Sequence, residues 1–178
     1  MNKAFVKETN DDDTLAPTPE MPVGVKNYIT PDGYRNLQQE LQHLLDVARP
    51  AALQLQTDEL NASATADAPE QSLREIEQRI HYLQTRLEVA EVVDASVHED
   101  GEQIFFGATV EYEHANGERQ QVTIVGLDEL DPERGKISWL SPIAQTLLGA
   151  HEGDVVQLAS PAGHEELHVL TVHYPAHS

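Results

Sequence analysis

The chain has 178 residues, 31 acidic residues against 11 Lys and Arg, a formal net charge of −20 and no cysteine. Its length suits one ordinary domain or two small ones. The negative charge repels nucleic-acid backbones, so stand-alone binding of DNA or RNA is not expected. The missing cysteines exclude disulfides, thiolate metal sites and a cysteine nucleophile. The charge favours a basic protein partner or a site built from carboxylates, although an acidic surface also serves solubility alone.

The sequence carries no sign of a membrane segment. It has no run of about 18 apolar residues, the length that a spanning helix needs. The first residues, MNKAFVKETNDDD, lack the apolar core of a signal peptide. We therefore expect a cytoplasmic protein that does not interact with a membrane.

Residues 1–27 differ in composition from the rest of the chain. They are polar, contain the acidic run Asp11 to Asp13 and hold three prolines. Such a segment has too little apolar content to pack, and this predicts a disordered acidic tail.

A first helix begins after Thr30, which is predicted as its N-cap, with Pro31 in the first helical position. Apolar residues then recur at spacings of three and four. Pro50 removes one backbone donor and predicts a kink. Beyond it the stripe is expected to continue through Ala51 and Leu55 to about Leu60. The stripe consists of Tyr34, Leu37, Leu41, Leu44 and Ala48, followed by those positions.

A second helix shows a stricter repeat and is predicted to start at Asp67 or Ala68, with Pro69 in its first turn. Its spacing of three, four, three, four, three is an a/d seam, which needs a partner helix. The first helix supplies one, so residues 28–94 are predicted to form an antiparallel coiled-coil hairpin with its tip near 60–69. The seam comprises Leu73, Ile76, Ile80, Leu83, Leu87 and Ala90.

After about residue 94 the apolar period changes to two, which indicates strands. Asn116-Gly117 predicts a two-residue hairpin turn. A short helix is expected over 142–148, with Ser141 as N-cap and Gly149 at its C-terminal end. Residues 95–178 are thus predicted to form an α+β domain. The strand candidates are 104–106, 108–112, 121–125, 137–139, 155–158 and 167–172.

Several blocks of the sequence resemble the Gre family of transcript-cleavage factors. YITPDGYRNLQQELQHLL, the Arg49-Pro50 pair and LREIEQRIHYL are similar to the family's helical hairpin, and more to the GreB branch than to the GreA branch. FFGATVEYE, ISWLSPIAQTLLGAHEGDVV and PAGHEELHVLTVHY resemble its C-terminal domain. The resemblance implies an FKBP-like domain that docks on the rim of the secondary channel of bacterial RNA polymerase. It also implies a coiled coil that runs down this channel.

The same resemblance suggests a docking segment. The family pattern SP-x-A-x-x-L-x-G falls on Ser141, Pro142, Ala144, Leu147 and Gly149, and we expect these residues to contact polymerase. The alternative is a helix that only covers the sheet. From the residues alone the two interpretations remain open.

The tip departs from the family. There the resemblance implies a GD-x-x-EN motif whose two acids hold a Mg²⁺ ion in the polymerase active centre. Aligned from the second helix without gaps, the first acid falls on Glu59, the second on Ala62 and the Asn on Ser63. The arm is also shorter than the family's by about five residues, or about 7.5 Å of helix. Asp58, Glu59 and Asp67 remain as candidate tip acids, with Asp58 and Glu59 as the candidate metal ligands. They could equally serve as cap and solvent residues, or contact another part of polymerase.

Gre hairpins also carry a basic patch that holds the RNA 3′ end. Arg74, Arg79 and Arg86 lie on the second helix here, but glutamates are interspersed among them. We therefore expect this role to be weakened.

Together these observations predict a polymerase regulator that is not itself an enzyme. It would be a monomer, bind RNA polymerase, hold no metal alone but share Mg²⁺ with the polymerase site, and stimulate cleavage weakly or not at all. The alternatives are an active cleavage factor with rearranged acids, or a Gre-derived module for a different partner such as a nucleoside diphosphate kinase. A prolyl isomerase would need an aromatic-walled cavity, whereas Phe105, Phe106 and Trp139 are expected in the core. Zinc is not expected, because the paired histidines of the C-terminal region lie in predicted strand and tail.

Overall fold

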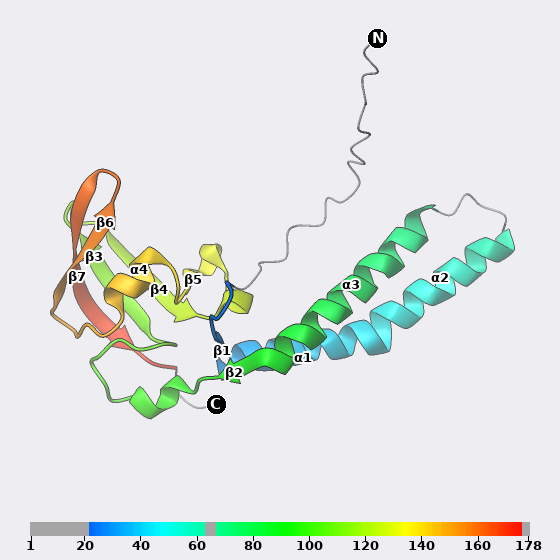
Figure 1. The fold of residues 1–178 in the computed structure, drawn as a ribbon, viewed down its shortest axis with the longest axis horizontal. Helices are drawn as coiled ribbons and strands as arrows, with labels where there is room; N and C mark the ends of the chain where they lie inside the picture. Colours follow the sequence, from blue (N-terminus) through cyan, green and yellow to red (C-terminus); the bar gives the residue numbers. More distant parts are fainter. Residues whose placement is uncertain (1–21, 63–66, 176–178) are drawn as a thin grey trace, which may run out of the picture.

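The computed structural model describes residues 22–62 and 67–175. Within the helical hairpin, it describes side chains up to Asp58 in the first half and from Ser72 in the second. Two bodies are visible in Figure 1: a long helical hairpin, here called the arm, and a C-terminal sheet domain from which it projects. The α+β class and the arrangement of hairpin followed by domain are as predicted. None of the described helices is long and apolar enough to cross a membrane.

The arm begins with α1 (Pro31–His43), whose start agrees with the sequence prediction. The Thr30 side chain caps the helix by accepting a hydrogen bond from the backbone N–H of Gly33 at 3.1 Å. Leu37 is buried against Leu83 and Ile29, and these three residues form the small core at the base of the arm.

The helix does not break at Pro50 but widens in front of it. Residues Leu44–Ala48 form a π-helical turn, in which the Arg49 N–H bonds to the Leu44 carbonyl, and α2 (Arg49–Ala62) follows directly. A π turn holds one extra residue and so rotates all later residues relative to the seam. The prediction that Ala51 and Leu55 continue the stripe is therefore wrong. Ala52 is buried instead, and Leu55 is 59% exposed.

The returning helix, α3 (Asp67–Val89), starts at one of the two predicted residues. It packs antiparallel against α1 and α2. Ile80 and Leu83 are buried in the seam, whereas Leu73, Ile76 and Leu87 are half-buried. A two-helix seam of this kind covers only one side of each helix, and the arm is accordingly a thin rod.

A two-stranded parallel sheet closes the base of the arm. β1 (Asn27–Ile29) pairs with β2 (Ala90–Val92), with Tyr28 opposite Glu91. Asn27 was expected as the end of the disordered tail, but it is a buried strand residue. Its apolar neighbour Ile29 anchors the strand. Of the predicted tail, residues 1–21 lie outside the described part of the chain.

The C-terminal domain is built on a five-stranded sheet of order β5-β4-β3-β7-β6. The β4–β5 pair is parallel and the other pairs are antiparallel. Helix α4 (Pro142–Leu147) contacts β6 and buries two residues in the domain core. Short 3₁₀ turns lie at Ala95–His98, Leu127–Glu129 and Pro132–Arg134. The strands are β3 (Thr109–His114), β4 (Arg119–Val125), β5 (Lys136–Ser138), β6 (Val155–Ser160) and β7 (Gly163–His173).

Two local predictions in this domain need correction. Residues 104–106 are no strand: Ile104 is a core residue whose N–H bonds to the Ala150 carbonyl, while Phe105 is partly exposed. The β3–β4 connection contains Asn116-Gly117 as predicted, but it is longer than two residues. The His114 N–H bonds to the Glu118 carbonyl across a three-residue loop, and Gly117 takes the left-handed conformation (φ 85°) that such loops require.

Candidate functional site: arm tip, docking segment and domain junction

The far end of the arm is formed by the end of α2 and the start of α3. Because α2 extends to Ala62, residues 59 and 62 lie one helical turn apart on the same side of the helix. The family's two acids would occupy these positions, but the second holds alanine. Asp58 is exposed and, as a direct neighbour of Glu59 in the helix, points about 100° away from it. The side chains of Glu59 and Asp67 lie outside the described residues, so their roles as tip acids stay predictions.

Two arginines on the arm, Arg79 and Arg49, bind carboxylates of the arm itself. Arg79 donates to both carboxylate oxygens of Glu40 at 2.6 and 3.0 Å, and this bond raises the pKa of the Arg79 guanidinium. Arg49 pairs with Glu77 at 2.8 Å. Both bridges link the outgoing and the returning helix. They neutralise positive charge that an RNA-binding surface would need.

The three arginines expected in a basic patch therefore have different surroundings. Arg74 is exposed. Arg79 is held by Glu40, and Arg86 is buried with its side chain 8% exposed. Two of the three guanidiniums are thus already paired with carboxylates, whereas within the described part of the chain Arg74 is exposed and has no such partner.

The expected docking segment is only partly available to a partner. Ser141 accepts a hydrogen bond from the Ala144 N–H at 3.3 Å and caps α4. Ala144 and Leu147 are fully buried in the domain core. Their apolar side chains fix α4 on the sheet and are not accessible at the surface, and contact of this segment with polymerase stays a prediction. Pro142 and Gly149 are exposed and remain candidates.

A buried ion pair joins the arm to the C-terminal domain. The Arg86 Nε lies 2.8 and 2.9 Å from the two carboxylate oxygens of Asp128. The Asp128 side chain is 2% exposed, and it also accepts hydrogen bonds from the Tyr82 hydroxyl at 2.8 Å and from Asn27 Nδ2 at 3.3 Å. Burial, followed by the bond to Asp128, raises the pKa of Tyr82 to about 12. The phenol therefore stays a donor at neutral pH.

The neighbouring acid, Glu129, binds the other helix of the arm. One of its oxygens accepts from the Thr30 hydroxyl, and the other accepts the backbone N–H groups of Thr30 and Gly126, each at 3.0 Å. Thr30 in turn caps α1, so the carboxylate is bonded to the start of that helix. Asp128 and Glu129, together with Asn27, Thr30, Tyr82 and Arg86, are called the clamp below.

Aromatic rings pack beside the clamp. Tyr28 of β1 lies 5.2 Å from Trp139 and 5.9 Å from Phe106 between ring centroids. Both rings were expected in the core of the C-terminal domain. Both are half-buried beside the arm, and Trp139 also packs against the core of the domain.

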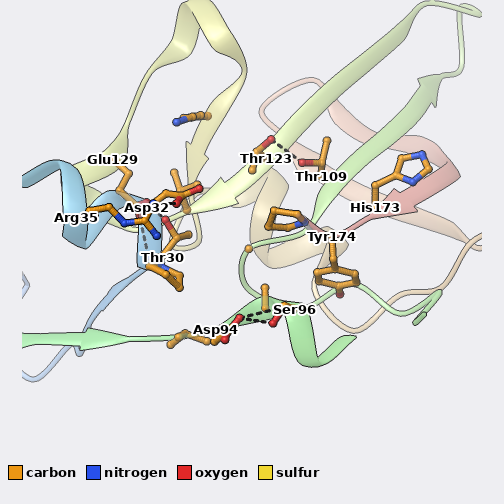
Figure 2. Close-up of a pocket in the computed structure, with 17 residues that line it drawn as sticks. Thr30, Asp32, Arg35, Asp94, Ser96, Thr109, Thr123, Glu129, His173 and Tyr174 are labelled. Carbon is orange, nitrogen blue, oxygen red and sulfur yellow. Dashed lines mark hydrogen bonds and ion pairs between the residues drawn. The ribbon is translucent and has the colours of Figure 1, made fainter. Parts of the chain in front are cut away.

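A cavity of about 360 Å³ lies at the same junction (Figure 2). Asp32 and Arg35, which form an ion pair at 3.3 Å, line it from the base of the arm. Thr109 and Thr123, whose hydroxyls are 2.9 Å apart, line it from the sheet together with Lys136. The cavity is therefore the part of the junction that the arm leaves open, with walls from both bodies.

Apart from Thr30, which was predicted as a helix cap, the residues of the clamp could not be recognised from the sequence. Arg86 looks like an ordinary surface arginine of a coiled coil, and Asp128-Glu129 look like solvent-exposed residues in a turn. Asn27 fell in the predicted tail, and Tyr82 lies one position before the seam residue Leu83. Only the tertiary fold brings these residues together.

Comparison with known proteins identifies the family. Residues 27–92 match the family model described as "Transcription elongation factor, N-terminal", and residues 99–174 match "Transcription elongation factor, GreA/GreB, C-term". The chain belongs to the GreA/GreB family. It is a Gre-family transcription elongation factor, and its curated relatives point to the GreB side, as the sequence blocks predicted.

Among the relatives of this Gre factor is the transcription elongation factor GreB of Neisseria meningitidis, 43% identical over 163 residues, which cover 86% of this chain and 98% of the relative. The GreB of Haemophilus influenzae is 39% identical over 156 residues, or 83% of this chain and 96% of the relative. Among solved structures, the GreA factor homolog Gfh1 of Thermus thermophilus is 30% identical and covers 84% of this chain and 99% of that one, with a TM-score of 0.37.

The described part of the Gre factor contains no cluster of three or more His, Asp or Glu side chains suited to a metal ion. At the tip, position 62 holds alanine, and the side chain of Glu59 lies outside the described residues.

Proposed function

We propose that this Gre factor binds bacterial RNA polymerase through its C-terminal domain and extends its arm into the secondary channel, with little or no stimulation of transcript cleavage. It would then act by occupying the channel, and any cleavage would be the polymerase's own chemistry. The family membership supports the polymerase as partner. The altered tip supports the weak cleavage.

One observation carries the second half of this proposal. Helix α2 continues through Ala62, so a carboxylate at residue 62 would stand one turn from Glu59 and face the same way. Alanine has no ligand atom to offer there. Magnesium in phosphoryl-transfer sites is commonly bound by one or two carboxylates with waters and phosphates, and loss of one acid weakens such a site. The pairing of Arg79 with Glu40 adds to this, because it reduces the attraction of the arm for RNA.

The test is a cleavage assay on stalled, backtracked elongation complexes in magnesium. The wild-type factor should shorten the RNA little beyond the rate of polymerase alone. Restoring the family's second acid with Ala62→Glu and its asparagine with Ser63→Asn should raise the rate by at least about tenfold, the scale on which groups around a metal change its affinity. Ala51→Glu is the matched control, since it adds the same charge at an exposed position of α2 away from the tip.

A second candidate, an active cleavage factor with rearranged acids, is favoured by the 43% identity to a GreB. It predicts robust cleavage by the wild-type chain that Glu59→Ala abolishes. That result would refute the proposal of weak cleavage and leave polymerase binding intact. Failure of the full chain to co-purify with core polymerase would refute the whole proposal and favour a different partner.

A further inference from the structure

We propose that Asp128 and Glu129 are positioning residues that fix the direction of the arm relative to the C-terminal domain. This inference rests on the proposed function, in which the domain docks and the arm must point into the channel. Nothing in the family match assigns a role to these two acids. The evidence is the way in which one short turn binds both helices of the arm.

The clamp connects two bodies through a single segment. On the side of the C-terminal domain, both clamp residues that bond to the arm lie in the 3₁₀ turn Leu127–Glu129. Asp128 binds Arg86 and Tyr82 on α3, whereas Glu129 binds Thr30 at the start of α1. Because both helices are tied to the same turn, the arm cannot rotate about one of them without breaking bonds to the other.

The bonds themselves restrict direction. Arg86 Nε donates one shared hydrogen bond to both oxygens of Asp128 in a site that is almost closed to water, and charge-assisted bonds are stronger than neutral ones. Gly33 lets the Glu129 carboxylate approach closely, since a Cβ at this position would collide with Glu129 Oε1, and a Cβ at Gly126 would collide with the Tyr28 carbonyl of β1. The Glu129 side chain is held in place by its hydrogen bonds to Thr30 and Gly126, at the edge of the cavity that it lines.

The length of the arm makes small angles important. From Pro31 to Ala62 the helix has 32 residues, which corresponds to about 48 Å. A swing of about 10° at the base would move the tip by about 8 Å, roughly twice the separation of two catalytic metal ions. An arm that acts at a defined point in a channel needs a rigid base, and the clamp provides one.

Distances between two spin labels attached to the free protein test the inference directly. The chain contains no cysteine, so Gln54→Cys on α2 and Gln157→Cys on β6, both exposed, give two unique labelling sites. The unchanged clamp should give a narrow distance distribution. Asp128→Asn and, independently, Glu129→Gln should broaden it to at least about twice the width, as expected for a hinge that has been released.

The matched control is Glu40→Gln, which removes an ion pair within the arm that does not cross the junction. It should leave the distribution unchanged. If neither Asp128→Asn nor Glu129→Gln broadens the distribution, the inference is wrong. If both instead abolish the helical circular dichroism of the arm, the acids are needed for folding and not for direction, and the inference is equally wrong.

A polymerase experiment separates this inference from the proposed function. Asp128→Asn should still co-purify with core polymerase, because the docking domain keeps its own core, but its effect on transcription should be lost. Wild-type chain that fails to bind polymerase refutes the proposed function and leaves the distance measurement valid. A variant with a released arm and full effect on transcription refutes the positioning role alone.

Discussion

Replacing Asp128 by alanine perturbs the most buried charge of the clamp. The carboxylate is 2% exposed and accepts hydrogen bonds from three residues, Arg86, Tyr82 and Asn27. Removing it leaves the Arg86 guanidinium, which is 8% exposed, without its partner in a largely buried site. A buried charge without its partner is far more costly than the absence of both groups.

The size of the effect follows from these contacts. Breaking a buried ion pair by removing one partner costs about 3–5 kcal/mol. The hydrogen bonds of Tyr82 and Asn27 to Asp128 belong to the same network, so their loss is largely contained in that figure. We therefore expect Asp128→Ala to lower the free energy of unfolding by about 4 kcal/mol. For a protein of this size that corresponds to a fall in Tm of about 8–16 °C.

Urea unfolding followed by two probes measures this change. Trp139 is the only tryptophan of the chain and packs on Tyr28, so its fluorescence reports on the junction. Far-ultraviolet circular dichroism reports mainly on the arm helices. The double variant Arg86→Met with Asp128→Ala should recover most of the loss, because it removes the stranded charge. Glu40→Ala, in an exposed pair, should cost no more than about 1 kcal/mol.

Two results would refute this reasoning. A loss below about 1 kcal/mol for Asp128→Ala would mean that the Arg86 side chain finds water or another partner, and that the ion pair is not a buried one in solution. Strictly additive effects of Arg86→Met and Asp128→Ala would mean that the two groups are not coupled, contrary to the 2.8 Å contact.

Three further predictions concern other parts of the molecule. Gly33→Ala should destabilise the factor by about 1 kcal/mol or more in thermal unfolding, because the new Cβ would collide with Glu129. This loss is expected although alanine favours helix over glycine by about 1 kcal/mol. A gain in stability would contradict the packing of Glu129 against Gly33. Leu55→Ser should change the free energy of unfolding by less than about 0.5 kcal/mol, since Leu55 is exposed. A large loss of stability would show that Leu55 packs in the seam, as a regular helix without the π turn would place it. The hydrogen bond to Glu165 raises the pKa of His114 above 6.5, so this contact stabilises the fold fully below pH 6.5 and fades as the pH rises through the raised value. His114→Gln should therefore flatten the stability profile around neutral pH by less than about 1 kcal/mol, since Glu165 is partly exposed; an unchanged profile would refute the pairing.

The features of the fold that local sequence determines were predictable. The cap at Thr30 and the seam of α3 depend on residues within one or two helical turns of each other, and both are found as expected. The register of α2 was not predictable in this way. A proline signals a disturbance, but the extra residue taken up by the π turn at Leu44–Ala48 depends on how the widened helix packs against its partner.

The clamp was unpredictable for a different reason. Its partners are separated by 42 residues between Arg86 and Asp128 and by 99 between Thr30 and Glu129. A single acidic residue in a turn carries no information on whether another segment will cover it. The tip acids, in contrast, could be assessed from sequence because the family motif is short and helical, and the change at Ala62 is visible without a structure.

The docking segment shows what a family pattern can and cannot specify. Each residue of SP-x-A-x-x-L-x-G has a structural use here: Ser141 caps α4, proline occupies its first turn, Ala144 and Leu147 enter the core, and Gly149 takes a positive φ of 86°. The pattern would therefore persist in any domain of this fold, whether or not it binds polymerase. Similarity in this block is evidence for the fold. Evidence for docking has to come from the exposed side of α4, where Pro142 is accessible and the buried residues are not.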